Sequence, residues 1–600
     1  MTTYRNFNQV LLNNFSRYAE KPAFMFKSGG SYRTISYGEF RDICFRVASG
    51  LIERGMQPGD RIAIFSQNRP EWAEADTGAI LAGAIGSAIY ASSLPAEAAF
   101  IIQNLDASFL FVEDSLQLEK ILAIRDKIPS VKMVFVFNDP FMRSDPSWIF
   151  PFSELLQEEA TPASVTKIHE LAEQIHGEDT MCVIYTSGTT GNPKGVVLTH
   201  NNYTRTIEML IEHVKDISKL KRNISFLPLA HAFERFAGYY MLLYMGSCIA
   251  YAESLDTLTQ NFREVKPNFL VAVPRVFEKM HARITQGVRS ASILKKAIFF
   301  RALSIGKEAG RYKSSGRPFP WHLTLRHKLA DVLLFKKVKE AFGGQLEFCC
   351  SGGAPLSKEI AEFFDAMDIL ILEGWGATEA TTPSTFNSPH DYRFGTVGKP
   401  LPGVEVRVAP DGELEVKGPN VFKEYWRNPE ETRATFTSDG FYRTGDIGEI
   451  NEEGRVIITD RKKQLIITSG GKNIAPAPIE SLLQSGRHIE MAYVHGDRRN
   501  YLTALLALDQ NAVTATAEYN GIKDCSWTDL IHHPLIMGKV QNEVDKANEE
   551  LPRFIQIKSF RILEKPFSIE AGEMTPTMKL KKRVVEEKYK DLLNSMYKED

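Results

Sequence analysis

The chain has 600 residues, enough for more than one domain, and 43% hydrophobic with 24% charged residues is ordinary for a soluble globular protein. A formal net charge of −2 excludes the strongly basic surface of a dedicated nucleic-acid-binding protein, so we expect no nucleic acid partner. The six cysteines show no Cys-x-x-Cys pair and no metal-ligand spacing, which indicates buried, reduced thiols in the cytoplasm. The first residues lack a basic start followed by an apolar core, so we expect no secretory signal.

Through the first 400 residues, apolar runs of strand length alternate with amphipathic segments, which predicts a layered α/β fold. The strand-like runs are Arg61–Phe65, Phe109–Val112, Met133–Val136 and Asn268–Val273. The most lipid-like stretch, 77–91, is too short for a bilayer span and contains three glycines. It therefore predicts a buried helix followed by a strand.

A loop rich in glycine and hydroxyl groups follows the apolar run 181–185. Its backbone can approach an anion closely at the glycines, its hydroxyls and N–H groups can donate to phosphate oxygens, and its lysine adds a mobile positive charge. The spacing differs from the common P-loop, G-x-x-x-x-G-K-[ST]. We predict that the loop binds the phosphates of a nucleotide through Thr186, Ser187, Gly188, Thr189, Thr190, Gly191 and Lys194.

The segment 281–328 is strongly basic, with eleven lysines and arginines against one acid, Glu308. Basic and apolar residues alternate at helical spacing in 293–303. One interpretation is a solvated helical insertion. The other is a surface that makes transient contact with an anionic membrane, with partial burial of Ile298, Phe299 and Phe300. The pattern leaves both open.

The sequence pattern changes near residue 398, where short runs of strand-forming residues separated by turns begin. They predict a small β-rich subdomain within 398–460. After residue 461, the apolar runs 491–494 and 502–506 predict strands of a compact α+β module.

Five motifs resemble, in content and order, those of the adenylate-forming superfamily of acyl- and aryl-CoA synthetases, beetle luciferases and peptide-synthetase adenylation domains. They are the loop at 186–195, Gly374–Glu379, Tyr442–Asp446, Gly454–Lys463 with Ser469–Asn473 after it, and Thr575–Leu580. The resemblance covers essentially the whole chain. It implies an N-terminal domain, residues 1–460, that binds ATP and a fatty acid, and a small mobile C-terminal domain, residues 461–600, that carries a catalytic lysine.

The resemblance also implies roles for single residues in forming an acyl-adenylate. Lys579 would stabilise the charge that builds up at the α-phosphate. Glu379 would be the Mg²⁺ ligand, because a carboxylate is a hard oxygen ligand, and Thr378 beside it would donate to a phosphate oxygen. His231 would be a gate residue near the substrate carboxylate.

The residues implied in nucleotide contact are Gly352, Gly353, Ala354, Gly374, Trp375 and Gly376 around adenine, and Asp446 and Arg461 at the ribose. The family more often has Tyr or Phe at the position of Trp375. Lys463 matches the hinge about which the C-terminal domain would rotate after adenylation. The loop that would then line the arm of CoA consists of Ser469, Gly470 and Gly471.

Three segments resemble long-chain fatty acyl-CoA synthetases in particular: His231–Arg235, Ser469–Asn473 and Met574–Lys581. They imply a long-chain fatty acid:CoA ligase that uses ATP. An acyl-AMP ligase that loads a carrier protein, or a CoA ligase for a medium-chain or other hydrophobic carboxylate, would carry the same motifs. A luciferase-like oxygenase and a non-catalytic lipid-binding relative are weaker alternatives. The protein would be cytoplasmic, with peripheral attachment to the inner face of a membrane and homodimer formation left open.

Overall fold

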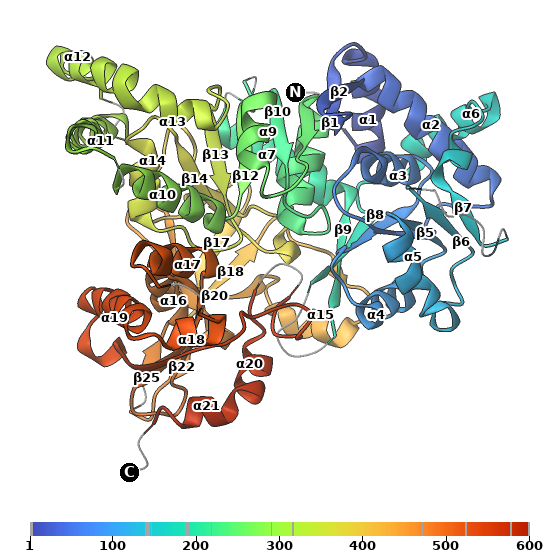
Figure 1. Ribbon diagram of the computed structural model, residues 1–600. Helices are drawn as coiled ribbons and strands as arrows, with labels where there is room; N and C mark the ends of the chain where they lie inside the picture. The colour runs from blue at the N-terminus through green and yellow to red at the C-terminus, as the bar shows by residue number, and fades with distance from the viewer. Residues whose placement is uncertain are drawn as a thin grey trace.

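The computed structural model describes residues 4–138, 145, 147–186, 192–215, 217, 219–289, 291–314, 317–470, 472–522, 525–575 and 579–597, without the side chains of Lys463 and Asn473. Figure 1 shows a large N-terminal part, coloured blue to yellow, above a smaller C-terminal lobe in orange and red. The α/β fold expected from the alternating apolar runs is confirmed.

One large sheet runs in the order β19-β9-β8-β4-β3-β5-β6-β7, and its six strands from β8 to β7 are parallel among the described residues. β9 pairs antiparallel with β8 across the predicted phosphate loop, and β19 pairs antiparallel with β9. The strands are β3 (Arg61–Phe65), β4 (Ile85–Ile89), β5 (Phe109–Val112), β6 (Met133–Val136), β7 (Ile149–Pro151), β8 (Thr180–Thr186), β9 (Lys194–Thr199) and β19 (Glu424–Tyr425).

The second large sheet runs in the order β16-β15-β14-β13-β12-β10-β11-β1-β2. Its central strands β14, β13, β12, β10, β11 and β1 are parallel, and β15, β16 and β2 join antiparallel. The strands are β1 (Pro22–Ser28), β2 (Ser31–Ser36), β10 (Arg222–Ser225), β11 (Cys248–Tyr251), β12 (Phe269–Ala272), β13 (Phe348–Ser351), β14 (Ile371–Trp375), β15 (Thr385–Phe386) and β16 (Lys399–Pro400).

The inner strands of both sheets are buried on their two faces, and alternate side chains of such a strand enter different cores. In β3, Ile62 and Ile64 belong to one core while Ala63 and Phe65 belong to another. The first of these cores also takes side chains from the second sheet, so a helical layer lies between the two sheets. The helices that contribute to this shared core are α1 (Phe7–Arg17), α2 (Tyr37–Glu53), α3 (Pro70–Leu81), α7 (His200–Val214) and α8 (Met241–Met245).

Further helices cover the outer faces of the two sheets. Those associated with the first sheet are α4 (Pro95–Leu105) and α5 (Ser115–Leu122), whereas α6 (Pro162–Gln174) packs against α1, α2 and α3. Those associated with the second sheet are α9 (Leu258–Val265), α10 (Pro274–Arg289), α11 (Ile293–Ser314), α12 (Trp321–Ala330), α13 (Lys336–Ala341) and α14 (Lys358–Asp365). The lipid-like stretch 77–91 is the end of α3 followed by β4, as predicted.

The expected β-rich segment forms a sheet in the order β17-β18-β20-β21, with β17 (Glu405–Val408), β18 (Glu413–Lys417), β20 (Tyr442–Ile450) and β21 (Val456–Arg461). Helix α15 (Pro429–Thr435) lies between β19 and β20 in the chain. The hairpin β22–β23 (Ile466–Ile467 and Asn473–Ile474) follows β21.

The C-terminal lobe is built on a sheet of β24 (Ile489–His495), β25 (Leu502–Leu508) and β26 (Ile557–Ile562). β25 is buried along its whole length. Its even-numbered residues join a core with α16 (Pro476–Gln484), α17 (Gln510–Tyr519), α18 (Trp527–His532) and α19 (Pro534–Glu549). Leu505 and Ala507 face α20 (Lys582–Lys588) and α21 (Lys590–Asn594).

The structure bears on the cysteines and on the length of the apolar helices. All six cysteines are free thiols, and five are buried, but Cys525 is exposed, so the expectation of buried thiols is wrong there. This residue lies in a short connection ahead of α18, where little chain covers it. Within the described residues, every helix is too short or too polar to span a bilayer.

Candidate active site

Asp446 is held between two donors that come from different elements. It lies on β20 opposite Arg461 of β21, whose Nε is 2.9 Å from one carboxylate oxygen. Trp375, at the end of β14, donates its indole N–H to the other oxygen at 2.8 Å. Asp446 is buried and Arg461 is exposed. The indole predicted to contact adenine therefore also fixes the carboxylate predicted to contact the ribose.

The structure brings Lys579, from the C-terminal lobe, to this pair. The surrounding protein and the Arg461 charge lower the pKa of Lys579 to about 8, and the Asp446 carboxylate opposes that shift. The lysine keeps solvent-accessible surface although protein atoms crowd around it. Its backbone is fixed by Thr575, which donates its N–H to the Lys579 carbonyl at 2.8 Å and accepts the Lys579 N–H on its hydroxyl at 3.1 Å. The C-terminal lobe thus places the Lys579 ammonium beside Asp446 and Arg461.

His231 lies close enough to Lys579 for their charges to interact. Burial, and next the charge of Lys579, lower the pKa of His231 to about 4, so its ring is neutral at pH 7. The backbone N–H of Phe233 donates to Nδ1 at 3.2 Å, which assigns the ring proton to Nε2. His231 is therefore a neutral hydrogen-bond donor, which fits the predicted gate role better than that of a general base.

Asn68 holds the backbone segment that leads to His231, a role that sequence reasoning missed. Its side-chain amide donates to the hydroxyl of Ser225 at 2.9 Å and to the carbonyl of Leu227 at 2.6 Å. Its carbonyl oxygen accepts the backbone N–H of Leu229 at 2.9 Å. One residue just before α3 therefore fixes both sides of a turn more than 150 positions away, and no local motif signals it.

A buried carboxyl group supports the turn that follows β13, which contains the predicted adenine-contacting residues. Glu373 on β14 accepts the backbone N–H of Leu356 at 3.1 Å, and burial raises the pKa of Glu373 to about 7. A Cβ at Gly352 would lie 3.1 Å from the ring of Phe233, and Gly353 has a φ of +81°. The turn therefore packs directly against the segment that carries His231.

The segment Gly374–Glu379 is tightly enclosed. A Cβ at Gly374 would approach the ring of Phe386 to 2.7 Å, and one at Gly376 would approach the backbone of Ser384 to 3.1 Å. Beyond these glycines, Thr378 and Glu379 form a short 3-10 turn (η5, Thr378–Ala380). Glu379 accepts a hydrogen bond from the hydroxyl of Tyr425 at 2.9 Å.

Lys194 lies over the ring of Tyr425, the residue that also donates to Glu379. It begins β9, and its Nζ lies 5.2 Å from the ring centroid of Tyr425, because β9 and β19 are paired neighbours. The ammonium forms an ion pair with Glu431 on α15. Lys194 and Glu379, far apart in the chain, are thus gathered around one residue that the motifs do not include.

Several predicted site residues are not part of this group. Ser187, Gly188, Thr189, Thr190, Gly191 and Gly471 lie outside the described residues, as does the side chain of Lys463. Thr186 ends β8 at the edge of the loop. Ser469 and Gly470 are exposed, and Ser469 bonds to Arg499 and Asn500 of the C-terminal lobe rather than to the residues around Asp446.

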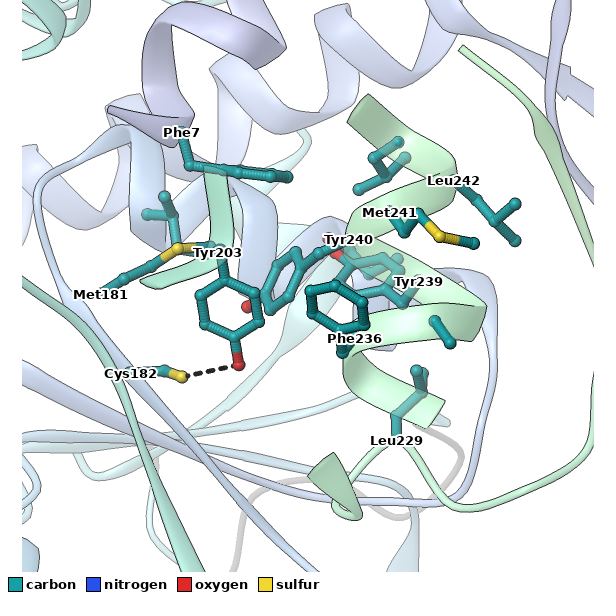
Figure 2. Packing of buried hydrophobic residues seen from close by; sticks show 14 of the residues in the cluster. Phe7, Met181, Cys182, Tyr203, Leu229, Phe236, Tyr239, Tyr240, Met241 and Leu242 are labelled. Carbon is teal, nitrogen blue, oxygen red and sulfur yellow. Dashed lines mark hydrogen bonds between the residues drawn. The ribbon is translucent and has the colours of Figure 1, made fainter. Parts of the chain in front are cut away.

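A buried polar network lies behind His231. A π-helical stretch (η3, Glu234–Tyr240) carries Arg235, which pairs with Asp76 of α3 at 2.6 Å with both side chains fully buried. The hydroxyl of Tyr240 donates to the second Asp76 oxygen at 2.8 Å. Figure 2 shows Tyr239 and Tyr240 of this stretch packed among Tyr203 of α7, Phe7 of α1 and Met181 of β8. The network anchors η3 in the core between the two sheets.

The side chains that could coordinate Mg²⁺ in this site are few. Among the described residues, no group of three or more His, Cys, Asp or Glu side chains could hold a metal ion by itself. Mg²⁺ commonly keeps several waters and takes one or two carboxylates together with substrate phosphates. Glu379 and Glu431 are the carboxylates gathered near Lys194 and Tyr425, and Glu431 is already paired with Lys194, so the residues present fit an ion bound together with a nucleotide rather than a resident metal centre.

Comparisons with known proteins identify the family of the chain. A family model described as AMP-binding enzyme matches residues 11–426, and one described as AMP-binding enzyme C-terminal domain matches residues 463–600. The chain belongs to the AMP-binding enzyme family. The resemblance to adenylate-forming enzymes noted from the motifs is thereby confirmed.

Relatives of this AMP-binding enzyme cover nearly its full length. It is 33% identical to the long-chain-fatty-acid–CoA ligase FadD15 of Mycobacterium bovis, over 95% of this chain and 93% of the relative. It is 30% identical to the long-chain-fatty-acid–CoA ligase ACSBG2 of Xenopus laevis, over 99% and 84%.

Solved structures share its fold at lower sequence identity. The anthranilate CoA ligase AuaEII in complex with anthranoyl-AMP has a TM-score of 0.73 at 19% identity, covering 99% of both chains. ATP-bound MatB from Rhodopseudomonas palustris has a TM-score of 0.66 at 23% identity, covering 98% of this chain and 99% of its own.

Proposed function

We propose that this AMP-binding enzyme is a long-chain fatty acid:CoA ligase that forms an acyl-adenylate from ATP and then an acyl-CoA. The near full-length similarity to two ligases of that name supports the substrate class. The observation that carries the chemistry is the position of Lys579, an ammonium from the C-terminal lobe that faces Asp446, Arg461 and His231.

In the first step, a carboxylate oxygen attacks the α-phosphorus of ATP, the bond from that phosphorus to the bridging oxygen breaks, and pyrophosphate leaves. Lys579 supplies positive charge where negative charge increases. Asp446, oriented by Trp375 and Arg461, accepts hydrogen bonds from ribose hydroxyls. The neutral His231 donates from Nε2 to the substrate carboxylate. Lys194 exchanges Glu431 for the outer phosphates of the nucleotide.

Magnesium would be held by Glu379 together with the phosphates of ATP, and it would neutralise their charge. Tyr425 orients the Glu379 carboxylate through its hydroxyl. Thr378 donates to a phosphate oxygen.

In the second step, the CoA sulfur attacks the acyl carbonyl carbon, the thiol proton passes to solvent and AMP leaves. We propose that residues 461–600 rotate as a unit about Lys463 relative to residues 1–460. Lys579 would then leave the site, and the loop with Ser469, Gly470 and Gly471 would line the CoA arm. The exposure of Ser469 and Gly470 in the present arrangement supports an element that is used only in the second step.

Pyrophosphate release with fatty acids from C6 to C20, measured with and without CoA, tests the substrate class. We expect turnover to increase with chain length into the long-chain range, because each buried methylene gains about 0.8 kcal/mol. A maximum at short or aromatic acids would contradict the proposal. Acyl-AMP formation without acyl-CoA formation would point to a carrier protein as the acceptor.

The adenylation rate should fall as pH rises through about 8. Raising the pH through the lowered pKa of Lys579 removes the proton that makes it a cation, whereas His231, with a pKa of about 4, stays neutral throughout. Lys579→Arg should lower the rate but abolish this alkaline limb, because the guanidinium stays charged. Any limb that persists in the variant would belong to another group, such as Glu373 with its pKa of about 7.

Asn68→Ala should raise the KM for the fatty acid and leave the KM for ATP nearly unchanged. The substitution removes three hydrogen bonds from the turn that leads to His231 and leaves the backbone of Leu227 and Leu229 without these partners. We expect a loss of about tenfold or more in kcat/KM, since each lost bond costs about 1 kcal/mol and 1.4 kcal/mol is a factor of ten. Equal changes in both KM values, or a lower Tm alone, would give Asn68 a purely structural role.

We also propose that the protein works in the cytoplasm and makes transient contact with an anionic membrane through the helices of 281–328. The substrate dissolves in lipid, and these helices expose many basic side chains. One detail expected from the sequence is wrong: Phe299 is only 6% exposed and packs near Phe363, so it is unavailable to lipid. Homodimer formation stays a prediction.

A further inference from the structure

The helical segment from α12 to α13 has apolar side chains on two opposite faces. α12, the π-helical turn η4 (Asp331–Phe335) and α13 follow one another without interruption. One face enters a core through Leu323, Ala330, Phe335 and Val338. The other is open to solvent: the exposed fractions are 77% for Trp321, 60% for Leu325, 61% for Leu329, 68% for Val332 and 47% for Leu333.

The exposed residues form a stripe rather than a scatter. Their spacing of four, four and three to four positions places them on one side of the helix. Isolated exposed leucines need no explanation, but a contiguous apolar row with a tryptophan at its start is typical of an interaction surface. Figure 1 shows α12 at the outer edge of the molecule, with α11 beside it.

Helix α11 extends the same hairpin. It runs antiparallel to α12, because the two are joined by the short connection 315–320 and Glu308 pairs with Arg326 at 3.2 Å. This direction places the first half of α11 beside η4. There α11 exposes Ile293 (87%), Leu294 (71%) and Phe300 (61%).

The charges around this apolar surface have one predominant sign. The exposed bases on these helices include Lys295, Arg301, Lys328, Lys336 and Lys337. The acids from 291 to 341 are Glu308, which pairs with Arg326, Asp331, which pairs with Lys339, and Glu340. The partner must therefore be apolar where it meets the stripe and anionic around it.

A bilayer with anionic headgroups meets both requirements. Tryptophan is favoured at the boundary between headgroups and hydrocarbon, and lysines beside an apolar face bind anionic lipid. A second copy of this chain fits less well, because a two-fold contact would bring two equally basic surfaces together.

We propose that the hairpin face, defined by the exposed side chains of Ile293, Leu294, Phe300, Trp321, Leu325, Leu329, Val332 and Leu333, is the surface on which the enzyme rests on an anionic membrane. The inference rests on the membrane contact proposed above and identifies the side chains that make it. It extends the contact surface past residue 328, the end of the basic segment, to Leu329, Val332 and Leu333.

Co-sedimentation with extruded vesicles tests the hairpin face independently of catalysis. Vesicles of phosphatidylcholine alone are compared with vesicles that contain phosphatidylglycerol, at low salt and without ATP. The wild type should bind the anionic vesicles. An apolar variant, Trp321→Ser with Leu325→Ser and Leu329→Ser, should lose about tenfold or more in partitioning, and so should a charge variant, Lys328→Glu with Lys336→Glu and Lys337→Glu.

Matched controls separate this face from surface polarity in general. Leu116→Ser with Leu255→Ser removes two exposed leucines elsewhere, with exposed fractions of 58% and 67%, and should bind vesicles like the wild type. All variants should keep the wild-type Tm and the wild-type activity on a water-soluble medium-chain acid. Absence of ligase activity in the wild type would refute the proposed function, but the comparison of vesicle binding between wild type and variants would still test the hairpin face.

Three outcomes would overturn the proposal. The first is wild-type partitioning by both triple variants. The second is equal binding to neutral and anionic vesicles, which would remove the role of the bases. The third is a wild-type dimer in solution that Trp321→Ser converts to a monomer, which would make the hairpin face a contact between copies of the chain.

Discussion

Lys579→Ala should reduce acyl-adenylate formation by about 10²–10³-fold while leaving thioester formation from supplied acyl-AMP close to the wild-type rate. A loss of this size is typical when one preorganised charge-stabilising donor is removed from an active site. The selectivity follows from the position of the lysine, which lies by Asp446, Arg461 and His231 in the present arrangement and would leave before CoA reacts. Pyrophosphate release and acyl-CoA formation from synthetic acyl-AMP measure the two steps separately.

Lys590→Ala is the matched control, because Lys590 is an exposed lysine of the same lobe on α21. It should leave both steps unchanged. If Lys579→Ala damaged both steps equally, the lysine would have a structural role, and its assignment to adenylation would fail.

Arg235→Met should destabilise the N-terminal part by about 3–5 kcal/mol, the cost of breaking a buried ion pair by removing one partner. The methionine fills much of the volume but leaves the Asp76 carboxylate buried without its charged partner, with the hydroxyls of Tyr239 and Tyr240 as its remaining donors. The loss should appear as a lower midpoint of urea unfolding, followed by a probe in the N-terminal part because a chain with several cores need not unfold in one step.

The double variant Asp76→Asn with Arg235→Met should recover part of the lost stability, because it removes the uncompensated charge. Losses that simply add would show that the two residues do not act as a pair. Wild-type stability of the Arg235→Met variant would show that the buried network does not anchor η3.

Local pattern predicted individual elements well where both faces of a strand are buried. Arg61–Phe65 and Phe109–Val112 have the predicted bounds, because continuous apolar runs of that length fit a parallel strand buried on both sides. The order of strands could not be predicted, since β4 lies between β3 and β8 through pairings that depend on the whole sheet.

The motifs named residues of the site but not their supports. Asp446 and Trp375 were each expected near the nucleotide, yet the hydrogen bond between them depends on how β14 meets β20. Tyr425 and Asn68 have no motif of their own, because their roles come from partners far along the chain. Likewise, the exposed stripe on α12 follows from which helix face the core covers, and periodicity alone cannot distinguish an apolar face turned inward from one turned outward.

A quenched single-turnover experiment with ATP labelled at the α-phosphate and a C16 fatty acid tests directly whether the enzyme forms an acyl-adenylate. Without CoA, the label should appear in an acyl-adenylate that stays bound to the enzyme, with one pyrophosphate released for each. On addition of CoA, the label should pass to AMP as an equal amount of acyl-CoA forms. Label in ADP, or acyl-CoA formed without a labelled acyl-adenylate before it, would contradict the proposed function.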